Sequence, residues 1–225
     1  MIRITEITNF KEWYETLALF EDVHIDFNQN GIKVQMKDVT NAFIISSFME
    51  LPVENTCSAT ISLDNLKTIK DSVTVYWSAE TLVFQAGITK YKSPVLKDPK
   101  VDALVLPELP VPKFEGVKAV IPHDLIKEML KVSEREEDIL FKGEGKTLIV
   151  TNSSNSIENT YENVLESDEI PVKSVFGFNY INMVIKVMKY FDEVSIRVGK
   201  DVPIIINLNK PGFSISYWIA PRIED

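Results

Sequence analysis

The order of predicted elements occurs twice along the chain. The periodicity of apolar residues predicts strand, helix, four strands, helix and three strands in the first half, and the same order in the second half. The repeat unit is about 110 residues long, and it is a repeat of topology rather than of residue identity. This repetition predicts an α+β chain of two similar domains with antiparallel sheets.

The expected strands alternate apolar and polar residues or are bounded by turn residues such as Asn30-Gly31. In the first half they are Ile2–Glu6, Val23–Phe27, Ile32–Met36, Ala42–Met49, Cys57–Ser62, Val73–Trp77, Leu82–Gln85 and Ile88–Lys92. In the second half they are Lys118–Ile121, Asp138–Lys142, Leu148–Thr151, Ile157–Leu165, Val172–Phe178, Val194–Val198, Pro203–Asn209 and Ser214–Ile219.

Four helices are expected between these strands. The first begins at Thr8 or Asn9 and runs to about Phe20, with its apolar residues on one face. The second is short, from Leu63 to Lys70. In the second half, helices run from Pro122 to about Ser133 and from about Asn179 to Phe191.

The two halves are joined by a proline-rich connector. Residues 93–113 include Pro94, Pro99, Pro107, Pro110 and Pro112, a density that interrupts strand pairing and favours an extended segment. Leu104 to Leu106 is too apolar for a simple spacer, so this part is expected to lie against the surface. The predicted domains are therefore 1–92 and 114–225, with 93–113 between them.

Composition restricts the class of protein. Hydrophobic residues make up 45% of the 225 residues and the net charge is −9, which is typical of a folded globular protein and opposes general binding to nucleic acid. Cys57 is the single cysteine, so no disulfide can form within the chain. No membrane-length apolar run or secretion signal is present, so the protein is expected to be intracellular, not secreted and without membrane contact. The sequon at Asn152 is interpreted as a chance match.

Lysines are the exception to the acidic composition. They recur in pairs on the predicted helices, three or four residues apart and opposite the apolar face, as in Lys186 and Lys189. One such pair is usually only a solvated helix face, but pairs at matching places of a repeat predict a common basic surface. That surface would contact phosphates without reading sequence.

Catalytic and metal-binding patterns were sought and are not found in the sequence. His24 and His123 lie far apart and lack metal-ligand spacing, and no nucleophile elbow, phosphate-binding loop or dinucleotide fingerprint occurs. The sequence therefore predicts a protein that is not an enzyme and carries no metal or cofactor. A β-rich hydrolase or small-ligand binder is the alternative from another class.

The C-terminal residues resemble the closing segment of the PCNA-type DNA polymerase sliding clamps. The resemblance rests on Asp201-Val202-Pro203, an apolar strand, and then Tyr217-Trp218-Ile219-Ala220-Pro221-Arg222-Ile223-Glu224. Residues 178–181 and 63–70 are similar too, and the repeat and connector match the family's two domains and interdomain loop. The resemblance is strong over about the last 50 residues and looser elsewhere.

This resemblance implies a DNA-clamp fold that forms a trimeric ring. Sheets would lie on the outside and back helices that line a central hole holding duplex DNA. The protein would then be a processivity factor at the replication site, in an archaeal cytoplasm, a nucleus or an infected host cell. The residues that match the family's DNA-facing cations are Lys11, Lys67, Lys70, Lys127, Lys131, Lys186 and Lys189.

The resemblance also implies a pocket for short clamp-binding peptides of DNA polymerase, clamp loader, ligase and nuclease. The matching residues come from the connector, the C-terminal tail and a strand in the first half. They are Asn41, Ala42, Phe43, Leu104, Leu106, Pro107, Pro203, Trp218, Ala220, Pro221 and Ile223. Apolar anchors in such a pocket would dominate peptide binding.

Two departures from the family pattern bear on these expectations. The chain is short for the family, and the missing length falls at the second helix, near Leu63. Trp218 also stands where the family usually has tyrosine. The strands that close the ring are expected near residues 87–92 and 143–165. Closure with identical subunits or with paralogues is left open, so a heterotrimeric clamp for repair or checkpoint scaffolding is the alternative reading.

Overall fold

The computed structural model describes residues 1–97, 104–106, 117–122, 125–132, 137–162, 164–165 and 172–222. Of the residues assigned from sequence to the peptide pocket, Pro107 and Ile223 lie outside these ranges. Of the residues assigned to the DNA-facing surface, the side chain of Lys127 lies outside the described part of the structure. The chain forms two compact units. Unit 1 comprises Met1–Val39, Ile45–Leu109 and Pro211–Ser214, and unit 2 comprises Thr40–Ile44, Pro110–Lys210 and Ile215–Asp225.

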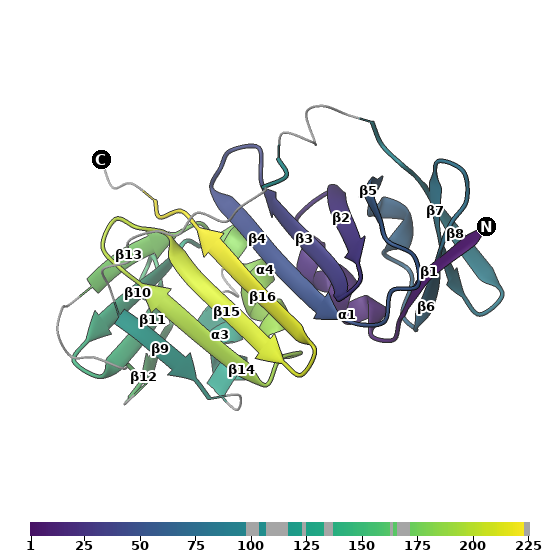
Figure 1. The fold of residues 1–225 in the computed structure, drawn as a ribbon. Coiled ribbons are helices and arrows are strands. Elements are labelled where there is room, and N and C mark those ends of the chain that lie inside the picture. The colour runs from purple at the N-terminus through teal and green to yellow at the C-terminus, as the bar shows by residue number, and fades with distance from the viewer. Residues whose placement is uncertain are drawn as a thin grey trace. The chain divides into compact units, whose positions relative to one another are not determined.

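The first half of the chain supplies two sets of four antiparallel strands (Figure 1). One set has the order β1-β6-β7-β8, from Ile2–Ile7, Val73–Trp77, Thr81–Ala86 and Thr89–Pro94. The other has the order β5-β2-β3-β4, from Cys57–Ser62, Asp22–Asn28, Gly31–Lys37 and Phe43–Glu50. The helix α1 spans Phe10–Leu17, and a single 3₁₀ turn, η1, spans Asp64–Leu66.

The second half supplies the same two sets. One has the order β9-β14-β15-β16, from Val117–Ile121, Glu193–Val198, Ile204–Lys210 and Phe213–Ile219. The other has the order β13-β10-β11-β12, from Val172–Phe176, Ile139–Glu144, Thr147–Asn152 and Glu158–Tyr161. The helices are α3, Ile126–Val132, and α4, Phe178–Met188.

The internal repeat predicted from the sequence is confirmed. Adding eight to each strand number converts the first-half orders into the second-half orders, so β1 corresponds to β9, β4 to β12 and β8 to β16. The helices follow the same rule, because α1 and α3 each follow the first strand of their half, and η1 and α4 each follow the fifth.

The prediction of a helix from Leu63 to Lys70 is wrong. The segment makes hydrogen bonds of the 3₁₀ type instead, from Leu66 N to Leu63 O at 2.9 Å and from Ile69 N to Leu66 O at 3.0 Å. Leu63, Leu66 and Ile69 are all buried, and their spacing of three matches the 3.0 residues per turn of a 3₁₀ helix rather than the 3.6 of an α-helix.

The strand predicted to reach Leu165 is shorter in the structure. Residues 158–161 form β12, and Leu165 makes only an isolated bridge to Ala119 of β9.

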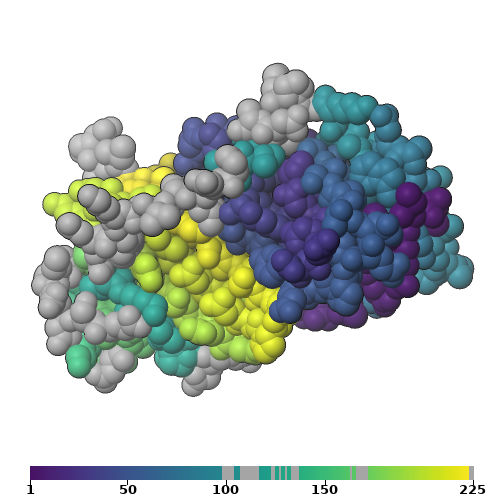
Figure 2. All heavy atoms as spheres, in the orientation of Figure 1, coloured from purple at the N-terminus to yellow at the C-terminus, as the bar shows by residue number. Residues whose placement is uncertain are grey.

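The core of unit 2 lies between its helices and its strands. In Figure 1, α3 and α4 lie on one face of the β9-β14-β15-β16 set, and the helices contact each other. The buried residues of α4, such as Ile181, Val184 and Ile185, recur with helical spacing, while β16 alternates buried and more accessible residues. Figure 2 shows the opposite face of these strands open toward the viewer.

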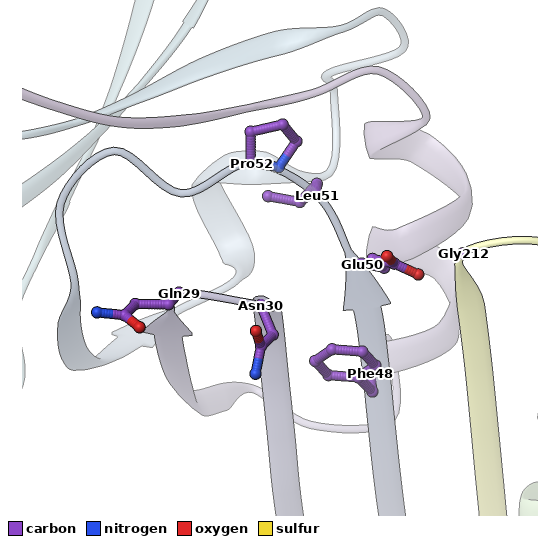
Figure 3. Close-up of a pocket in the computed structure, with 7 residues that line it drawn as sticks. All are labelled: Gln29, Asn30, Phe48, Glu50, Leu51, Pro52 and Gly212. Carbon is purple, nitrogen blue, oxygen red and sulfur yellow. The ribbon is translucent and has the colours of Figure 1, made fainter.

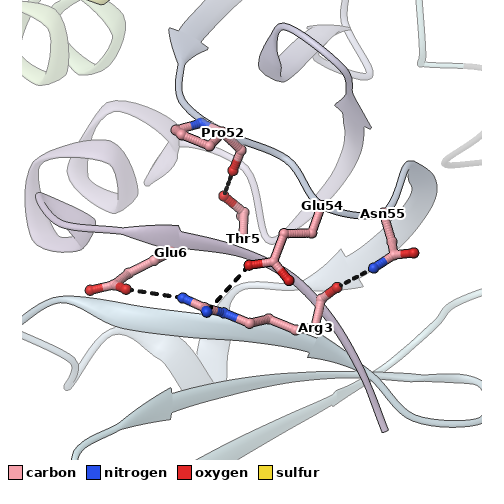
Figure 4. A network of polar contacts seen from close by, with 6 residues as sticks. All are labelled: Arg3, Thr5, Glu6, Pro52, Glu54 and Asn55. Carbon is pink, nitrogen blue, oxygen red and sulfur yellow. Dashed lines mark hydrogen bonds and ion pairs between the residues drawn. The ribbon is translucent and has the colours of Figure 1, made fainter.

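Several strands at the edge of a set are covered by another stretch of chain. The edge of β1 is covered by the segment before β5, through the Thr5–Val53 bridge, a bond from Glu54 N to Ile4 O at 2.8 Å and one from Asn55 Nδ2 to Arg3 O at 2.7 Å (Figure 4). Arg3 also pairs with Glu6 and Glu54 at 3.2 and 3.3 Å.

The repeat extends to these covering segments. Residues 95–96, which follow β8, cover β5, and residues 221–222, which follow β16, cover β13. Residues 164–165, which follow β12, cover β9. The chain around β4 and β16 is joined by bonds from Glu50 N to Gly212 O at 2.7 Å and from Ala220 N to Ala42 O at 2.8 Å.

Two strands keep an open edge. Within the described residues, β8 pairs only with β7, and β12 pairs only with β11. Their outer backbone groups have no strand partner in that part of the chain. Open edges favour aggregation unless they are short, charged or occupied by a partner strand.

Candidate functional site

The basic residues of unit 2 lie on exposed helix surface. Lys131 of α3, Lys186 of α4 and Lys189 just after α4 are exposed. Lys131 pairs with Glu128 on its own helix at 2.5 Å, and the Lys189 ammonium lies 4.7 Å from the centre of the Tyr190 ring. These are local contacts that leave the side chains at the surface.

The accessible face of α4 carries no acidic residue. Asn179, Asn182, Lys186 and Lys189 follow one another at spacings of three and four, which places them on one side of the helix. The sequence prediction missed the two asparagines. They could have been found by extending the spacing of the lysines toward the N-terminus of the helix. The first turn of the helix itself contains no acidic residue. Amide and ammonium groups in one row are donors suited to phosphate oxygens.

The basic residues of unit 1 have acidic neighbours in sequence. Lys11 of α1 pairs with Glu15 at 3.6 Å, and Lys67 and Lys70 are exposed around η1, between Asp64 and Asp71. Residues 10–17 and 63–71 together hold three lysines and four carboxylates, a formal charge of 3 − 4 = −1. Residues 126–132 and 178–189 hold four lysines and one carboxylate, 4 − 1 = +3. The basic surface is thus concentrated in unit 2.

The C-terminal tail is fixed to unit 2 by its backbone. Pro221 bridges Phe176, and Arg222 N donates to Val175 O at 2.7 Å. The Arg222 guanidinium pairs with Asp138 at 3.2 Å, and the other oxygen of Asp138 accepts a bond from Phe178 N at 3.1 Å. Asp138 therefore joins the tail to the first turn of α4, where a carboxylate is favoured by the helix dipole.

The predicted pocket residues of unit 2 differ in accessibility. Ala42, Pro203, Trp218, Ala220 and Pro221 are partly accessible. The Nε1 atom of Trp218 is buried and has no partner in the described part of the chain. Asn41 is exposed with a left-handed backbone, φ 58°, a region that asparagine tolerates better than most residues.

Phe43 is buried rather than accessible. Its buried ring stacks on Tyr180 at a centroid distance of 5.3 Å and meets Tyr217 at 5.5 Å. Phe43 is therefore part of the aromatic core that supports the tail and the adjoining surface.

The predicted pocket residues of unit 1 belong to the connector. Leu104 O accepts a bond from Lys37 N at 2.9 Å, and Leu106 N donates to Gln35 O at 3.1 Å. Val105 between them bridges Met36. The apolar triplet thus lies against β3 as expected, with all three side chains partly accessible.

A separate open cavity of unit 1 contains none of the predicted residues. It has a volume of about 750 Å³ and is lined by Gln29, Asn30, Phe48, Glu50, Leu51, Pro52 and Gly212 (Figure 3). The lining combines a partly accessible phenylalanine with amide side chains from the β2–β3 turn. It holds no constellation of nucleophile, base and metal ligand.

Two further features of the described residues limit the chemistry. No three His, Cys, Asp or Glu side chains among them are grouped as metal ligands would be. None of the described helices has the length and apolar character that crossing a bilayer requires. Burial, and then the nearby Asp26 carboxylate, raise the pKa of the Cys57 thiol to about 11, which leaves it protonated and unreactive near neutral pH.

Comparison with curated proteins finds sliding clamps. The chain is 27% identical to DNA polymerase sliding clamp 3 of Sulfurisphaera tokodaii, across 99% of both chains. It is 26% identical to the DNA polymerase sliding clamp of Methanococcoides burtonii, across 95% of both. The clamp of Thermococcus onnurineus is 27% identical, across 92% of this chain and 91% of that one. No protein-family model matches the chain.

Solved structures with the same fold are PCNA structures. PCNA from Thermococcus kodakaraensis superposes with a TM-score of 0.77 at 20% identity, across 98% of this chain and all of the other. A. fulgidus PCNA, solved with the C-terminal region of FEN-1 bound, gives 0.77 at 19% identity, across all of both chains. A chain of the PCNA2-PCNA3 complex from Sulfolobus tokodaii gives 0.73 at 22%, across 98% of this chain and all of the other. The chain is thus similar in sequence to DNA polymerase sliding clamps, and it has the fold of the PCNA structures.

Proposed function

We propose that this protein is a non-catalytic DNA sliding clamp. It encircles duplex DNA as a trimeric ring inside the cell and tethers DNA polymerase and other replication or repair enzymes. The observation that carries this proposal is the match to a named sliding clamp across 99% of both chains, together with a repeated fold shared with PCNA. No catalytic constellation in the described residues competes with it.

The DNA-facing surface of the proposed clamp is the exposed side of its helices. Lysines there contact phosphates without reading bases, which is the mode of contact that permits sliding. The acid-free row on α4 supports this role most strongly, and Asn179 and Asn182 join Lys186 and Lys189 in it. Lys131 of α3 belongs to the same basic set, and Lys127 is assigned to it from its spacing in the sequence alone. Lys11, Lys67 and Lys70 of unit 1 are weaker contacts, because carboxylates are close to them in the sequence.

The open strand edges support assembly into a ring. Within the described residues, β8 pairs only with β7 and β12 only with β11, so each strand has one edge without a strand partner. The β8 strand of one copy can therefore pair with the β12 strand of the next copy. Since the two edges differ, the contact is head-to-tail, which is the type of contact that builds a ring when successive rotations return to the first copy.

Client enzymes are proposed to bind through short peptides with apolar anchors. In unit 2, the partly accessible Trp218, Ala220 and Pro221 are the proposed apolar contacts, and Tyr217 beside them packs against the buried Phe43. In unit 1, Leu104 and Leu106 form a second apolar strip, fixed to β3. Each is proposed as a peptide contact by itself, because buried aromatic and aliphatic anchors carry most of the energy of such interfaces.

The α4 row is tested by reversing its charges. The variant Lys186→Glu/Lys189→Glu is expected to bind linear duplex at low salt about tenfold or more weakly than the unchanged protein, with a flatter dependence on salt, because fewer phosphates are neutralised. Fluorescence anisotropy on a labelled duplex at several salt concentrations measures both effects.

Lys67→Glu/Lys70→Glu is the comparison variant in unit 1. It should reduce the affinity for linear duplex less than the α4 variant does. Lys173→Glu/Lys200→Glu is the matched control, with the same charge change at exposed positions of β13 and the β14–β15 turn. An α4 variant that binds like this control contradicts the assignment of α4 to DNA.

A further inference from the structure

The open edges of β8 and β12 carry opposite charge. Lys90 and Lys92 are exposed on one face of β8, two residues apart. Glu158 of β12 and Glu162 just after it are exposed on one face at the other edge, on either side of exposed Thr160. The lysines therefore mark one open edge and the glutamates the other.

These charges have no compensating partner among the described residues. The cross-strand neighbours of Lys90 and Lys92 are Gln85 and Val83, and that of Glu158 is Thr151, none of them charged. None of the four side chains forms an ion pair with another described residue. The four side chains are exposed beside the open edges, where a strand from another molecule can bring charges close to them.

We propose, on the basis of the clamp function above, that these four residues select a second copy of this chain as the ring neighbour. Pairing β8 with β12 places lysines near glutamates. Pairing β8 with β8 places lysines near lysines, and pairing β12 with β12 places glutamates near glutamates. Opposite charges across neighbouring strands stabilise the pairing and like charges oppose it. The edges therefore favour the head-to-tail contact that closes a ring and disfavour two-fold dimers.

The overall charge strengthens this selection. Copies of a chain with net charge −9 repel one another at long range. A local match between a basic and an acidic edge offsets that repulsion only where the two edges meet. The basic edge also protects a free subunit from pairing through its β8 strands, which is a common role of lysine on edge strands.

Charge reversal and its restoration test the proposal. The variants are Lys90→Glu/Lys92→Glu, Glu158→Lys/Glu162→Lys and the quadruple combination, with Lys173→Glu/Lys200→Glu as the control for two lysine reversals. Native mass spectrometry and analytical ultracentrifugation over a dilution series give the protein concentration at which each trimer dissociates. Circular dichroism checks that every variant is folded.

The unchanged protein and the control are expected to be trimers. Each edge variant should dissociate at a concentration about tenfold or more higher than the unchanged protein does. The quadruple variant should regain most of the lost trimer stability, because its two edges again carry opposite charges. A mixture of the two edge variants, one of them ¹⁵N-labelled, should give particles that contain both subunits.

The contrary outcomes separate the inference from the proposed function. If the folded edge variants assemble as well as the control, or if the quadruple variant does not recover, charge does not select the neighbour and the inference fails while the ring stands. If the unchanged protein forms no trimer by itself, the proposal of a self-closing ring fails, and assembly with paralogous subunits takes its place.

Discussion

Tyr217 and Tyr161 are buried ionisable residues of unit 2. Tyr217 is fully enclosed next to Phe43, and burial raises its pKa far above the ordinary value of 10.0. Burial also raises the pKa of Tyr161, to about 12. Both phenols ionise more readily in the unfolded chain than in the folded one. Above pH 10 the unfolded state therefore binds fewer protons than the folded state, and stability falls as pH rises.

Alkaline unfolding follows from this difference. Between pH 10 and pH 12, the free energy of unfolding should fall by up to about 1.4 kcal/mol per pH unit for each buried tyrosine. Absorbance of tyrosinate and circular dichroism, recorded together during titration, should show part of the tyrosine ionisation coinciding with unfolding. The Tyr217→Phe variant should show a shallower fall, and an unchanged slope in this variant would contradict the assignment.

Asn152 organises the turn between β11 and β12. Its buried side chain donates to Glu137, Ser154 and Ser156 at 3.0, 3.0 and 2.7 Å, and its carbonyl oxygen accepts from Ser156 N and Ile157 N at 2.9 and 3.0 Å. An amide engaged in this way in the folded state cannot serve as a glycan acceptor, in agreement with a chance sequon.

Replacing Asn152 tests the turn. Asn152→Ala should lower the free energy of unfolding by about 2–4 kcal/mol, because several buried groups lose their partners together. Asn152→Asp should lower the free energy of unfolding further near neutral pH, since it sets a second carboxylate beside Glu137. Its free energy of unfolding should recover as the pH is lowered and the carboxylates are protonated. Urea unfolding at two pH values measures both, with the exposed Asn179→Ala as control. A loss no greater than the control's would show that the turn does not depend on this side chain.

At the scale of the element, α4 and the C-terminal tail depend on one carboxylate. Asp138 accepts from Phe178 N and pairs with Arg222. The ion pair is partly exposed, so it contributes less than the helix-capping bond.

The comparison of Asp138→Ala with Asp138→Asn separates the two roles. The alanine variant should lose about 1–2 kcal/mol of stability, with faster hydrogen exchange in the first turn of α4. The asparagine variant keeps an acceptor for Phe178 N and should retain most of the stability. Equal losses in both variants would assign the effect to the ion pair instead.

The elements differ in how far the sequence determines them. Strands such as Cys57–Ser62 and Val73–Trp77 were predicted with their observed bounds, because β-branched and aromatic residues alternate between clear turn signals. The segment after Leu63 was mispredicted because three apolar residues at spacing three fit both helix types over so short a length. The lysines of the candidate DNA-facing surface could be predicted from their spacing on the helices alone. Asn179 and Asn182 could not, because an amide side chain becomes a candidate phosphate contact only when the same helix face lacks acidic residues.

The strand edges lie beyond sequence prediction for another reason. Whether a strand keeps an open edge depends on where distant segments such as 53–55 and 221–222 pair, and these pairings leave no local pattern. The structure was needed to separate β8 and β12 from the strands that are covered.

At the scale of the whole molecule, the charge distribution is compatible with the proposed action of an acidic chain on DNA. The net charge is −9, yet the helices of unit 2 carry a formal +3. In the proposed clamp, attraction to phosphate is strongest at the helices of unit 2, and the net negative charge of the chain as a whole opposes adhesion to DNA. A protein of this kind is held on DNA chiefly by enclosing it rather than by affinity.

Enclosure of DNA is the central claim, and DNA with blocked ends tests it most directly. The protein is threaded at low salt onto linear duplex that has one biotin–streptavidin block, the second end is then blocked, and the salt is raised. The labelled clamp should stay on doubly blocked DNA and leave rapidly once a restriction enzyme opens one end. Loss at the same rate from blocked and cut DNA would contradict the account, because it would show that the protein is bound to the duplex without surrounding it.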